Sequence, residues 1–419
     1  MQILIIGAGI GGLIAALSLE AAGFDDIVVA ERSAEIRGLG VGINLLPHAV
    51  RELTELGAAE RIAELGVEPG TLAYFNRHGQ TIWSEPRGRD AGYRWPQLSV
   101  HRGMLQLALR DLVEERLPDA IRLGHRLLAV SDDGRAATFE LPDGARSELT
   151  ADVIVAADGI HSAARAQRYP DEGGPVWGGL TLWRGTALVE PCLDGRTMIM
   201  VGDAEQKFVA YPLSDPSLDG GRQRINFIAE RRGGGVGAGS DADWNRRIDR
   251  APVAEIFDGW TYDWLDIPAI IADAEELLEY PMVDRDAIPS WVFGRTVLLG
   301  DAAHAMYPNG SNGGSQATLD ARTLAYHLAT APTIDAALAA YEADRRPATA
   351  RLLELTRQTG PERVMQIAHE RAPEGFADVH DVIPAAELER IAAEYKTAAG
   401  FHPDQLNARS SLGARVGAA

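Results

Sequence analysis

The sequence predicts an α/β fold: a parallel sheet covered by helices, a β-rich lobe inserted into it, and helices toward the C-terminal end. Three observations predict this arrangement. A strand, a glycine-rich turn, a helix and a second strand follow one another at the start of the chain. Two later apolar runs also end in a turn, at Asp158-Gly159 and at Gly300-Asp301. The segments between them alternate in polarity and contain most of the tryptophans, as antiparallel strands do.

The first unit is the most regular part of the chain. Residues 3–6 form a continuous apolar run that ends at Gly7, which is typical of a buried parallel strand. Apolar residues from Leu13 to Leu19 then follow at helical spacing, Gly23 supplies a stop, and residues 27–30 form the next strand. This βαβ order predicts a Rossmann-like domain.

Later segments extend the same sheet. Residues 153–156 and 296–299 are predicted strands, and a helix is predicted from Gly313 to Leu328. The glycine-rich stretch 233–240 is predicted to be a loop. The predicted organisation is a discontinuous dinucleotide-binding domain of residues 1–70, 98–175 and 282–350, a β-rich substrate domain of residues 71–97 and 176–281, and a C-terminal helical region of residues 351–419.

Composition narrows the possible partners. The 419 residues include 60 acidic and 40 basic ones, a net charge of −20, which argues against nucleic acid and against anionic lipid surfaces. The sequence has no run of 18 apolar residues, so we expect no membrane association. Its single cysteine, Cys192, rules out a disulfide framework and agrees with a cytoplasmic location. No metal-binding or hydrolase motif is present, so we expect no metal.

The first motif is Gly7-Ala8-Gly9-Ile10-Gly11-Gly12, which has the G-x-G-x-x-G spacing. Its glycines allow a tight turn, a close approach of pyrophosphate to the backbone, and close packing of helix on strand. Glu31 ends the second strand, where a carboxylate can accept hydrogen bonds from ribose. This combination predicts a dinucleotide but does not distinguish FAD from NAD.

The other two motifs differ in how strongly they indicate a flavin. Asp158-Gly159 after a strand is most often a simple turn. The third motif runs from Gly300-Asp301 through Pro308 to Gly313-Gly314 and a helix. Its acid can bind a ribityl chain, its glycines admit a flat ring, and the helix N-terminus can stabilise a reduced, anionic flavin. Because a nicotinamide enzyme has no use for such a segment, the prediction is FAD.

With these motifs the sequence resembles the single-component FAD-dependent aromatic hydroxylases of the para-hydroxybenzoate hydroxylase fold. The likeness covers roughly residues 1–350 and includes Arg345-Arg346-Pro347. Further strings resemble the phenazine-pathway hydroxylases within that family: residues 35–44, 83–88, 101–103, 183–185 and 280–286. Ser315 departs from the Asn that many members of the family have there, which leaves the hydrogen bonding at the flavin pyrimidine ring open.

The resemblance implies a role for each matching residue. Gly7 belongs to the first glycine motif. The ADP half and pyrophosphate would be held by Gly9, Gly12, Glu31, Arg32 and Arg102, and Asp301 would bind the ribityl or pyrophosphate end. The isoalloxazine would be lined by Val41, Gly42, Gly313 and Gly314. Asp158 and Gly159 would lie near both FAD and an approaching nicotinamide.

A substrate pocket needs flat, apolar walls. Six aromatic residues lie in or near the β-rich lobe, and most of them must serve core packing. We expect Trp183, Tyr211 and Pro308 to line the pocket. His304 follows Asp301 by one turn and is the only candidate for acid or base catalysis, although a structural role suits its position equally well.

The resemblance implies a monooxygenase that takes hydride from a transiently bound NADH or NADPH, reacts with O2 to form a flavin C4a-hydroperoxide, and hydroxylates a small aromatic or heteroaromatic substrate, with phenazines as one class. Three alternatives stay open: a flavin oxidoreductase without oxygen transfer, a non-catalytic flavin-binding protein, and a nicotinamide-only dehydrogenase. We expect a monomer or a homodimer.

Overall fold

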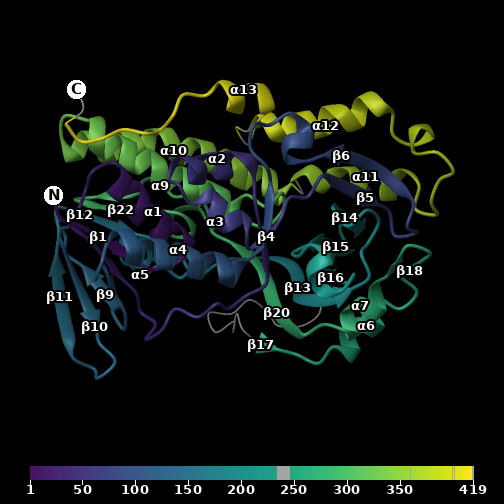
Figure 1. Ribbon diagram of the computed structural model, residues 1–419, viewed down its shortest axis with the longest axis horizontal. Coiled ribbons are helices and arrows are strands. Elements are labelled where there is room, and N and C mark those ends of the chain that lie inside the picture. The colour runs from purple at the N-terminus through teal and green to yellow at the C-terminus, as the bar shows by residue number, and fades with distance from the viewer. Residues whose placement is uncertain (234–245, 359, 399, 401, 418–419) are drawn as a thin grey trace.

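The computed structural model describes residues 1–233, 246–358, 360–398, 400 and 402–417. Two sheets lie side by side along the long axis of the molecule, and helices from the last third of the chain cross above both (Figure 1). The predicted α/β fold is confirmed. The predicted loop at 233–240 lies, apart from Gly233, outside the described residues.

The first sheet has six strands in the order β21-β22-β12-β1-β2-β8. All of its strands are parallel except β21, which pairs antiparallel with β22 at the edge. Parallel strands end at the same edge of a sheet, so the turns after β1, β2, β12 and β22 meet there. The bounds are β1 Ile3–Ile6, β2 Ile27–Ala30, β8 Ile121–Arg122, β12 Val153–Ala156, β21 Val292–Phe293 and β22 Thr296–Leu298.

Helix α1 (Ile10–Ala21) follows the glycine turn, and it is apolar nearly all round. It is buried accordingly, between α4 and α9 and against β1 and β2. A Cβ on Gly12 would lie 2.0 Å from the carbonyl oxygen of Gly7, so only glycine lets the helix approach the strand this closely. The neighbouring helices are α4 Arg102–Arg116, α9 Gly313–Thr330 and α10 Ile334–Arg357.

The second sheet has eight strands in the order β17-β20-β13-β16-β15-β14-β5-β6. The antiparallel arrangement expected for this lobe holds for every pair except β14 and β5, which are parallel. The β5–β6 hairpin comes from a distant part of the chain, so no tight turn dictates its direction on β14. The bounds are β5 Thr71–Phe75, β6 Thr81–Pro86, β13 Val176–Val189, β14 Thr197–Gly202, β15 Gln206–Pro212, β16 Gln223–Arg232, β17 Arg246–Arg247 and β20 Glu276–Asp284.

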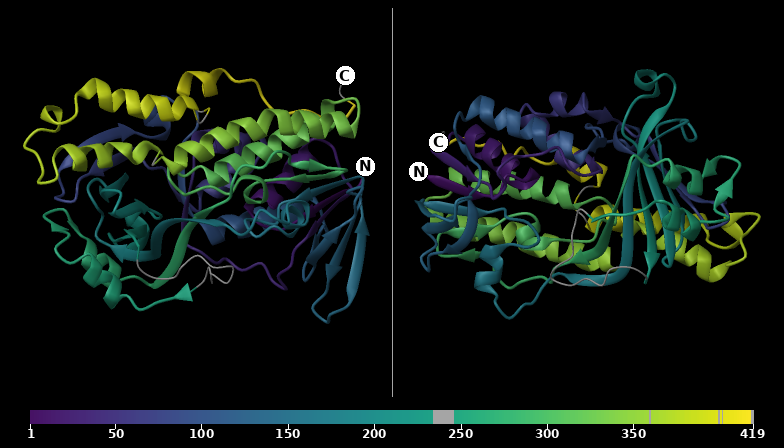
Figure 2. Two further views of the ribbon diagram at one scale, coloured as in Figure 1. Left: turned by 180° about the vertical axis from the view of Figure 1, so that it is seen from behind. Right: turned by 90° about the horizontal axis from the view of Figure 1, so that it is seen from below.

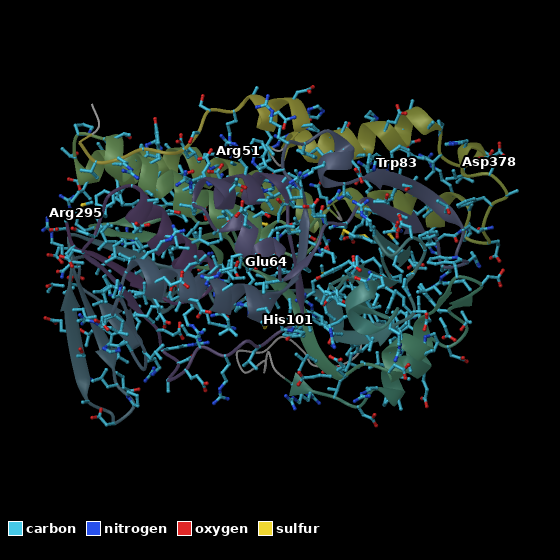
Figure 3. All side chains as sticks on the ribbon, viewed as in Figure 1. Arg51, Glu64, Trp83, His101, Arg295 and Asp378 are labelled. Carbon is cyan, nitrogen blue, oxygen red and sulfur yellow. The ribbon has the colours of Figure 1, made fainter. Side chains whose placement is uncertain are left out.

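Smaller elements fill the space around the two sheets. One three-stranded sheet has the order β3-β7-β4, and another has the order β11-β10-β9. His101 ends β7 and lies between the two large sheets (Figure 3). The strands are β3 Gly42–Leu45, β4 Gly66–Val67, β7 Leu98–His101, β9 Arg126–Val130, β10 Ala136–Glu140, β11 Arg146–Thr150, β18 Thr261–Tyr262 and β19 Leu265–Asp266. The helices are α2 Pro47–Glu55, α3 Ala59–Ala63, α5 Ala163–Arg168, α6 Ala251–Ile256, α7 Ile267–Ala272 and α8 Asp301–His304.

The last part of the chain joins the two sheets. Helices α11 (Arg363–Arg371) and α12 (Ala385–Ala398) run along the eight-stranded sheet in both views of Figure 2, and the Lys396 Nζ lies 2.6 Å from a carboxylate oxygen of Glu85 on β6. After α13 (Pro403–Ala408) the chain returns over α2, where Arg51 donates to the carbonyl oxygens of Arg409 and Ser410. Arg51 lies under this segment in Figure 3.

Candidate active site

A cavity of about 360 Å³ lies where the parallel sheet meets the eight-stranded sheet. One wall is formed by the turns after β1, β12 and β22 together with the first turn of α9. The other wall is one face of β13, β14, β15 and β16. The three glycine-rich motifs, distant in sequence, therefore share one cavity with the β-rich lobe.

The first glycine turn presents backbone to this cavity. Gly9, Ile10 and Gly11 line it, and a Cβ built on Gly9 meets no atom within 4 Å. Gly7 has φ +105°, and a Cβ there would lie 2.5 Å from the carbonyl oxygen of Ala157 on the neighbouring strand. The turn is therefore packed tightly against the neighbouring strand at Gly7 and is open to the cavity at Gly9. At the open side the N-terminus of α1 has no side-chain cap, so its backbone N–H groups are available to a ligand.

Glu31 and Arg32 lie beside this turn but outside the cavity wall. The Glu31 carboxylate accepts hydrogen bonds from the backbone N–H of Ala8 at 2.8 Å and of Ser33 at 2.9 Å. Arg32 is exposed, and its charge contributes, after burial, to lowering the pKa of His161. These residues mark the side of the glycine turn where the predicted adenosine half would lie.

Asp158 and Gly159 have different structural roles. Asp158 is half-buried, and one carboxylate oxygen accepts from the backbone N–H of Ala163 at 2.9 Å and of Ala164 at 3.3 Å, at the start of α5. Its other oxygen has no hydrogen-bond partner among the described residues. Burial raises the pKa of this carboxyl. Gly159 lines the cavity with φ +78°, and a Cβ there would enter open space.

Arg102 and Asp301 face one another across the cavity edge. Arg102 begins α4, and its backbone N–H donates to the carbonyl oxygen of Val41 at 2.8 Å, which joins the predicted Val41-Gly42 segment to this helix. Val41 itself is buried and Gly42 lines the cavity. Burial lowers the pKa of Arg102, and the negative charge of Asp301 opposes this shift.

The third motif brings a helix N-terminus to the cavity. Gly313 and Gly314 form the first turn of α9 and line the wall, and no side chain caps this turn. A Cβ on Gly313 meets nothing within 4 Å. Ser315 lies behind them, and its hydroxyl accepts from the backbone N–H of Leu46 at 3.1 Å. Ser315 therefore holds the turn between β3 and α2 in place.

These residues fit FAD. Gly9, Gly159 and Gly313, from the three motifs, all leave open space where a side chain would stand. Two helix N-termini without side-chain caps, those of α1 and α9, can accept the negative charge of phosphates and of a reduced ring. Arg102 adds a guanidinium at the cavity, near Asp301. A Cβ at any of the three glycines would fill the space that a flat ring and a pyrophosphate need.

His304 is a structural residue. Its Nε2 lies 2.5 Å from an Asp320 carboxylate oxygen, both side chains are buried, and the ring packs against Trp291 at 5.3 Å. It does not line the cavity. The ring is enclosed between α8 and α9 behind the wall, so the structure does not bring the predicted acid or base candidate His304 into the cavity.

The structure places two of the three predicted substrate-wall residues at the cavity. Tyr211 on β15 and Pro308 line the cavity, and burial raises the pKa of Tyr211 to about 12. Trp183 does not line it: this side chain lies in the core on the opposite face of the sheet, where its indole N–H donates to Glu279 at 2.9 Å. Side chains alternate along a strand, so the neighbouring Arg184 takes that place in the cavity.

Several lining residues were not identified from the sequence. Met198, Met200, Val209 and Ile228 form the apolar wall, and Glu230 is a buried carboxylate in it. Strand alternation could have found Val209 once Tyr211 was placed on the cavity side, because every second residue of β15 shares its face. The residues of β14 and β16 also required the pairing of these strands with β15. Glu362 also lines the cavity, and no motif marks it.

Comparison with known proteins agrees with this geometry. A family model described as an FAD binding domain matches residues 1–176 and 263–356. The chain is 41% identical over 362 residues to phenazine 1,6-dicarboxylic acid hydroxylase of Lysobacter antibioticus, which covers 85% of this chain and 89% of that protein. It is 32% identical over 348 residues to aurachin C monooxygenase/isomerase of Stigmatella aurantiaca, over 82% of this chain and 85% of the relative.

A solved structure shows the same fold. The Klebsiella pneumoniae HpxO structure with FAD and uric acid superposes with a TM-score of 0.73 at 24% identity, over 97% of this chain and 96% of that one. The chain belongs to the FAD binding domain family, and it is an FAD-dependent aromatic monooxygenase that consumes NAD(P)H and O2.

Proposed function

We propose that this enzyme hydroxylates a flat heteroaromatic carboxylic acid of the phenazine type. The observation that carries the proposal is Arg184, a half-buried guanidinium on the cavity face of β13, beside the apolar side chains of β14, β15 and β16. Its Nη2 donates to the carbonyl oxygen of Gly42 at 3.0 Å, and its Nε is buried without a partner among the described residues. A carboxylate is the ligand group that best satisfies such a guanidinium.

The rest of the wall suits fused rings. Met198, Met200, Val209 and Ile228 come from three neighbouring strands and form an apolar surface. Methionine side chains adapt to flat aromatic ligands. The Tyr211 phenol is protonated at neutral pH, as an ordinary tyrosine is, and burial raises its pKa further. Its hydroxyl can therefore donate a hydrogen bond. The relative from Lysobacter, which is named for a phenazine dicarboxylic acid, supports the same ligand class.

The predicted cofactor residues are part of this proposal. Bound FAD supplies hydride acceptance from NAD(P)H and activation of O2. Gly9, Gly159 and Gly313 leave room for it, Arg102 offers a charge to its pyrophosphate, and Asp301 offers an acceptor to its hydroxyls. The eight-stranded sheet closes the other side of the cavity and keeps water from the reacting ring.

Gly313→Ala is expected to weaken FAD binding about tenfold, because a methyl group would occupy open space at the first turn of α9. Gly174→Ala is the matched control, since a Cβ there also meets nothing but lies away from the cavity. Titration of each apoprotein with FAD, followed by flavin fluorescence, measures the change. Equal dissociation constants for both variants would remove Gly313 from the flavin site.

The substrate class is tested by turnover. Phenazine-1-carboxylic acid, unsubstituted phenazine and a benzoic acid are each mixed with enzyme, NADH or NADPH, and ¹⁸O₂. We expect the phenazine acid to stimulate NAD(P)H oxidation most strongly and to gain one ¹⁸O atom. Oxidation without oxygen gain would indicate a flavin oxidoreductase, and a preference for uncharged phenazine would contradict the role of Arg184.

Location and assembly are also proposals. A cytoplasmic enzyme fits the supply of reduced nicotinamide and a single, half-buried cysteine. Among the described residues, the helices are all too short or too polar to cross a bilayer. We propose a monomer or a homodimer, which light scattering on a sizing column distinguishes.

A further inference from the structure

Three charged side chains form a buried cluster at the wall of the cavity. Lys207 on β15 lies between two carboxylates: its Nζ is 3.0 Å from Glu230 on β16, and it donates to Glu362 at the start of α11. All three side chains are less than a tenth exposed. A buried cluster of this kind is costly to maintain, and the structure contains one ammonium against two carboxylates.

The cluster separates two spaces. Glu230 and Glu362 line the large cavity, and both also line a small polar cavity of about 40 Å³. That small cavity is bounded further out by Gln206, Arg232 and Gln366, and the Arg232 side chain is 45% exposed. The two carboxylates are therefore the partition between the aromatic pocket and a polar route toward solvent.

The charges that act on Glu230 come from three directions. Lys207 faces it from β15, Glu362 from the turn that precedes α11, and Arg184 from β13. Burial raises the pKa of Glu230, and this effect outweighs the opposing charges of Lys207 and Arg184. Burial alone would lower the pKa of Lys207, but the two carboxylates raise it, so the lysine stays charged. Because the lysine keeps its proton, the group in this cluster that can gain or lose a proton is a carboxylate.

We propose that Glu230 exchanges protons with the hydroxyl group of the aromatic ligand and passes them to solvent past Glu362 and the small polar cavity. This inference rests on the proposed function, because an aromatic hydroxylation always leaves a hydroxyl on the ring. In the exchange the ring O–H bond breaks, its electron pair stays on the ring oxygen, and the proton forms an O–H bond with the Glu230 carboxylate. The reverse step returns it, and no atom is oxidised or reduced.

Three acids line the described part of the wall, Asp301, Glu230 and Glu362, and Glu230 suits this role best. It lies on the strand face that carries the apolar side chains, whereas Glu362 lies on the segment before α11. Asp301 lies at the far, cofactor end beside Arg102, whereas Glu230 stands among Met200, Val209 and Ile228 on the proposed substrate side. A carboxyl whose pKa is raised by burial matches the pKa of a phenol-type hydroxyl more closely than an ordinary glutamate does. Proton transfer by a positioned side chain typically contributes about 100-fold or more to rate.

The test is Glu230→Gln, which keeps the shape and leaves Lys207 paired with Glu362. Glu279→Gln is the control, since Glu279 is a carboxylate of the same sheet on the opposite face. In the wild type and control, kcat for a phenazine acid that already carries a ring hydroxyl should fall on the acidic side as Glu230 becomes protonated. In Glu230→Gln the rate should be at least tenfold lower with KM little changed, and this acidic limb should disappear. An unchanged pH profile in Glu230→Gln would overturn the proposal.

A second measurement does not depend on the substrate. Infrared difference spectra of the FAD-loaded protein over a pH titration should show the carbonyl band of a buried protonated carboxyl that titrates above the usual glutamate range. The band should shift promptly in D₂O, and it should be missing in Glu230→Gln but present in Glu279→Gln. If the band persists in Glu230→Gln, the inference fails even when phenazine turnover is confirmed. If the band behaves as expected but no phenazine is hydroxylated, only the proposed substrate class fails.

Discussion

Arg184→Met is expected to raise the KM for an aromatic carboxylic acid by about 100-fold, while FAD binding stays within about twofold of the wild type. A charged hydrogen bond contributes about 1.5–3 kcal/mol, and a guanidinium can make two parallel ones to a carboxylate. Arg184 is suited to this because its Nε has no partner among the described residues and its charge lies 5.9 Å from the Tyr280 ring centroid at the apolar wall.

Steady-state kinetics with a matched pair of ligands separates this effect from damage to the cavity. The KM for a ligand that lacks the carboxylate, such as unsubstituted phenazine, should change little in Arg184→Met. Arg184→Lys should recover part of the affinity, because an ammonium keeps the charge but loses the two-pronged geometry. An equal loss for both ligands would contradict the assignment and point instead to the contact between Arg184 and the Gly42 carbonyl oxygen.

Asp320→Ala is expected to lower the free energy of unfolding by about 3–5 kcal/mol, the range for removing one partner from a buried ion pair. One Asp320 oxygen lies 2.5 Å from His304 Nε2 and accepts from the Gly300 backbone N–H at 3.1 Å. The other accepts from Arg345 Nε at 2.8 Å. Without the carboxylate, Arg345 would remain buried with an uncompensated charge. Urea unfolding of the two proteins measures the difference.

A surface pair provides the control for this prediction. His327 Nε2 and an Asp344 oxygen are 2.7 Å apart on the same two helices, α9 and α10, but Asp344 is 60% exposed. Exposed pairs contribute about 0–1 kcal/mol, so Asp344→Ala should have little effect on unfolding. Equal destabilisation by the two substitutions would mean that the buried position of Asp320 does not matter.

The same network predicts acid sensitivity. Burial alone would raise the pKa of Asp320, but His304 and Arg345 together hold it at about 2. This is below the value of about 3.9 for an unfolded chain, so the folded state binds fewer protons. The stabilisation is fully present above pH ~4 and is lost as the pH falls toward 2. Asp320→Asn should therefore reduce the pH dependence of unfolding in that window.

The sequence alone determined those parts of the fold and of the site that depend on residues close together in the chain. The run of residues 3–6, the spacing of Gly7, Gly9 and Gly12, and the acid at Glu31 predict a βαβ unit, because close backbone approach admits only certain residues at certain positions. The motif from Gly300 to Gly314 predicted a flavin, and the family match agrees. Motifs of this kind need no knowledge of distant contacts.

Only the tertiary structure decided what faces the cavity. Trp183 and Arg184 are adjacent, and a strand places their side chains on opposite faces of the sheet. The sequence does not show which face lines the cavity, because that depends on how the eight-stranded sheet packs against the parallel sheet. His304 was a catalytic candidate, and only the packing of α9 shows that its ring lies against Asp320 and outside the cavity. Glu362 comes from a helical region without any motif and reaches the cavity only because α11 packs on the eight-stranded sheet. A backbone motif consists of residues that are close in sequence, so it can be recognised from the sequence. A pocket wall consists of side chains from strands that are distant in sequence and come together only on folding.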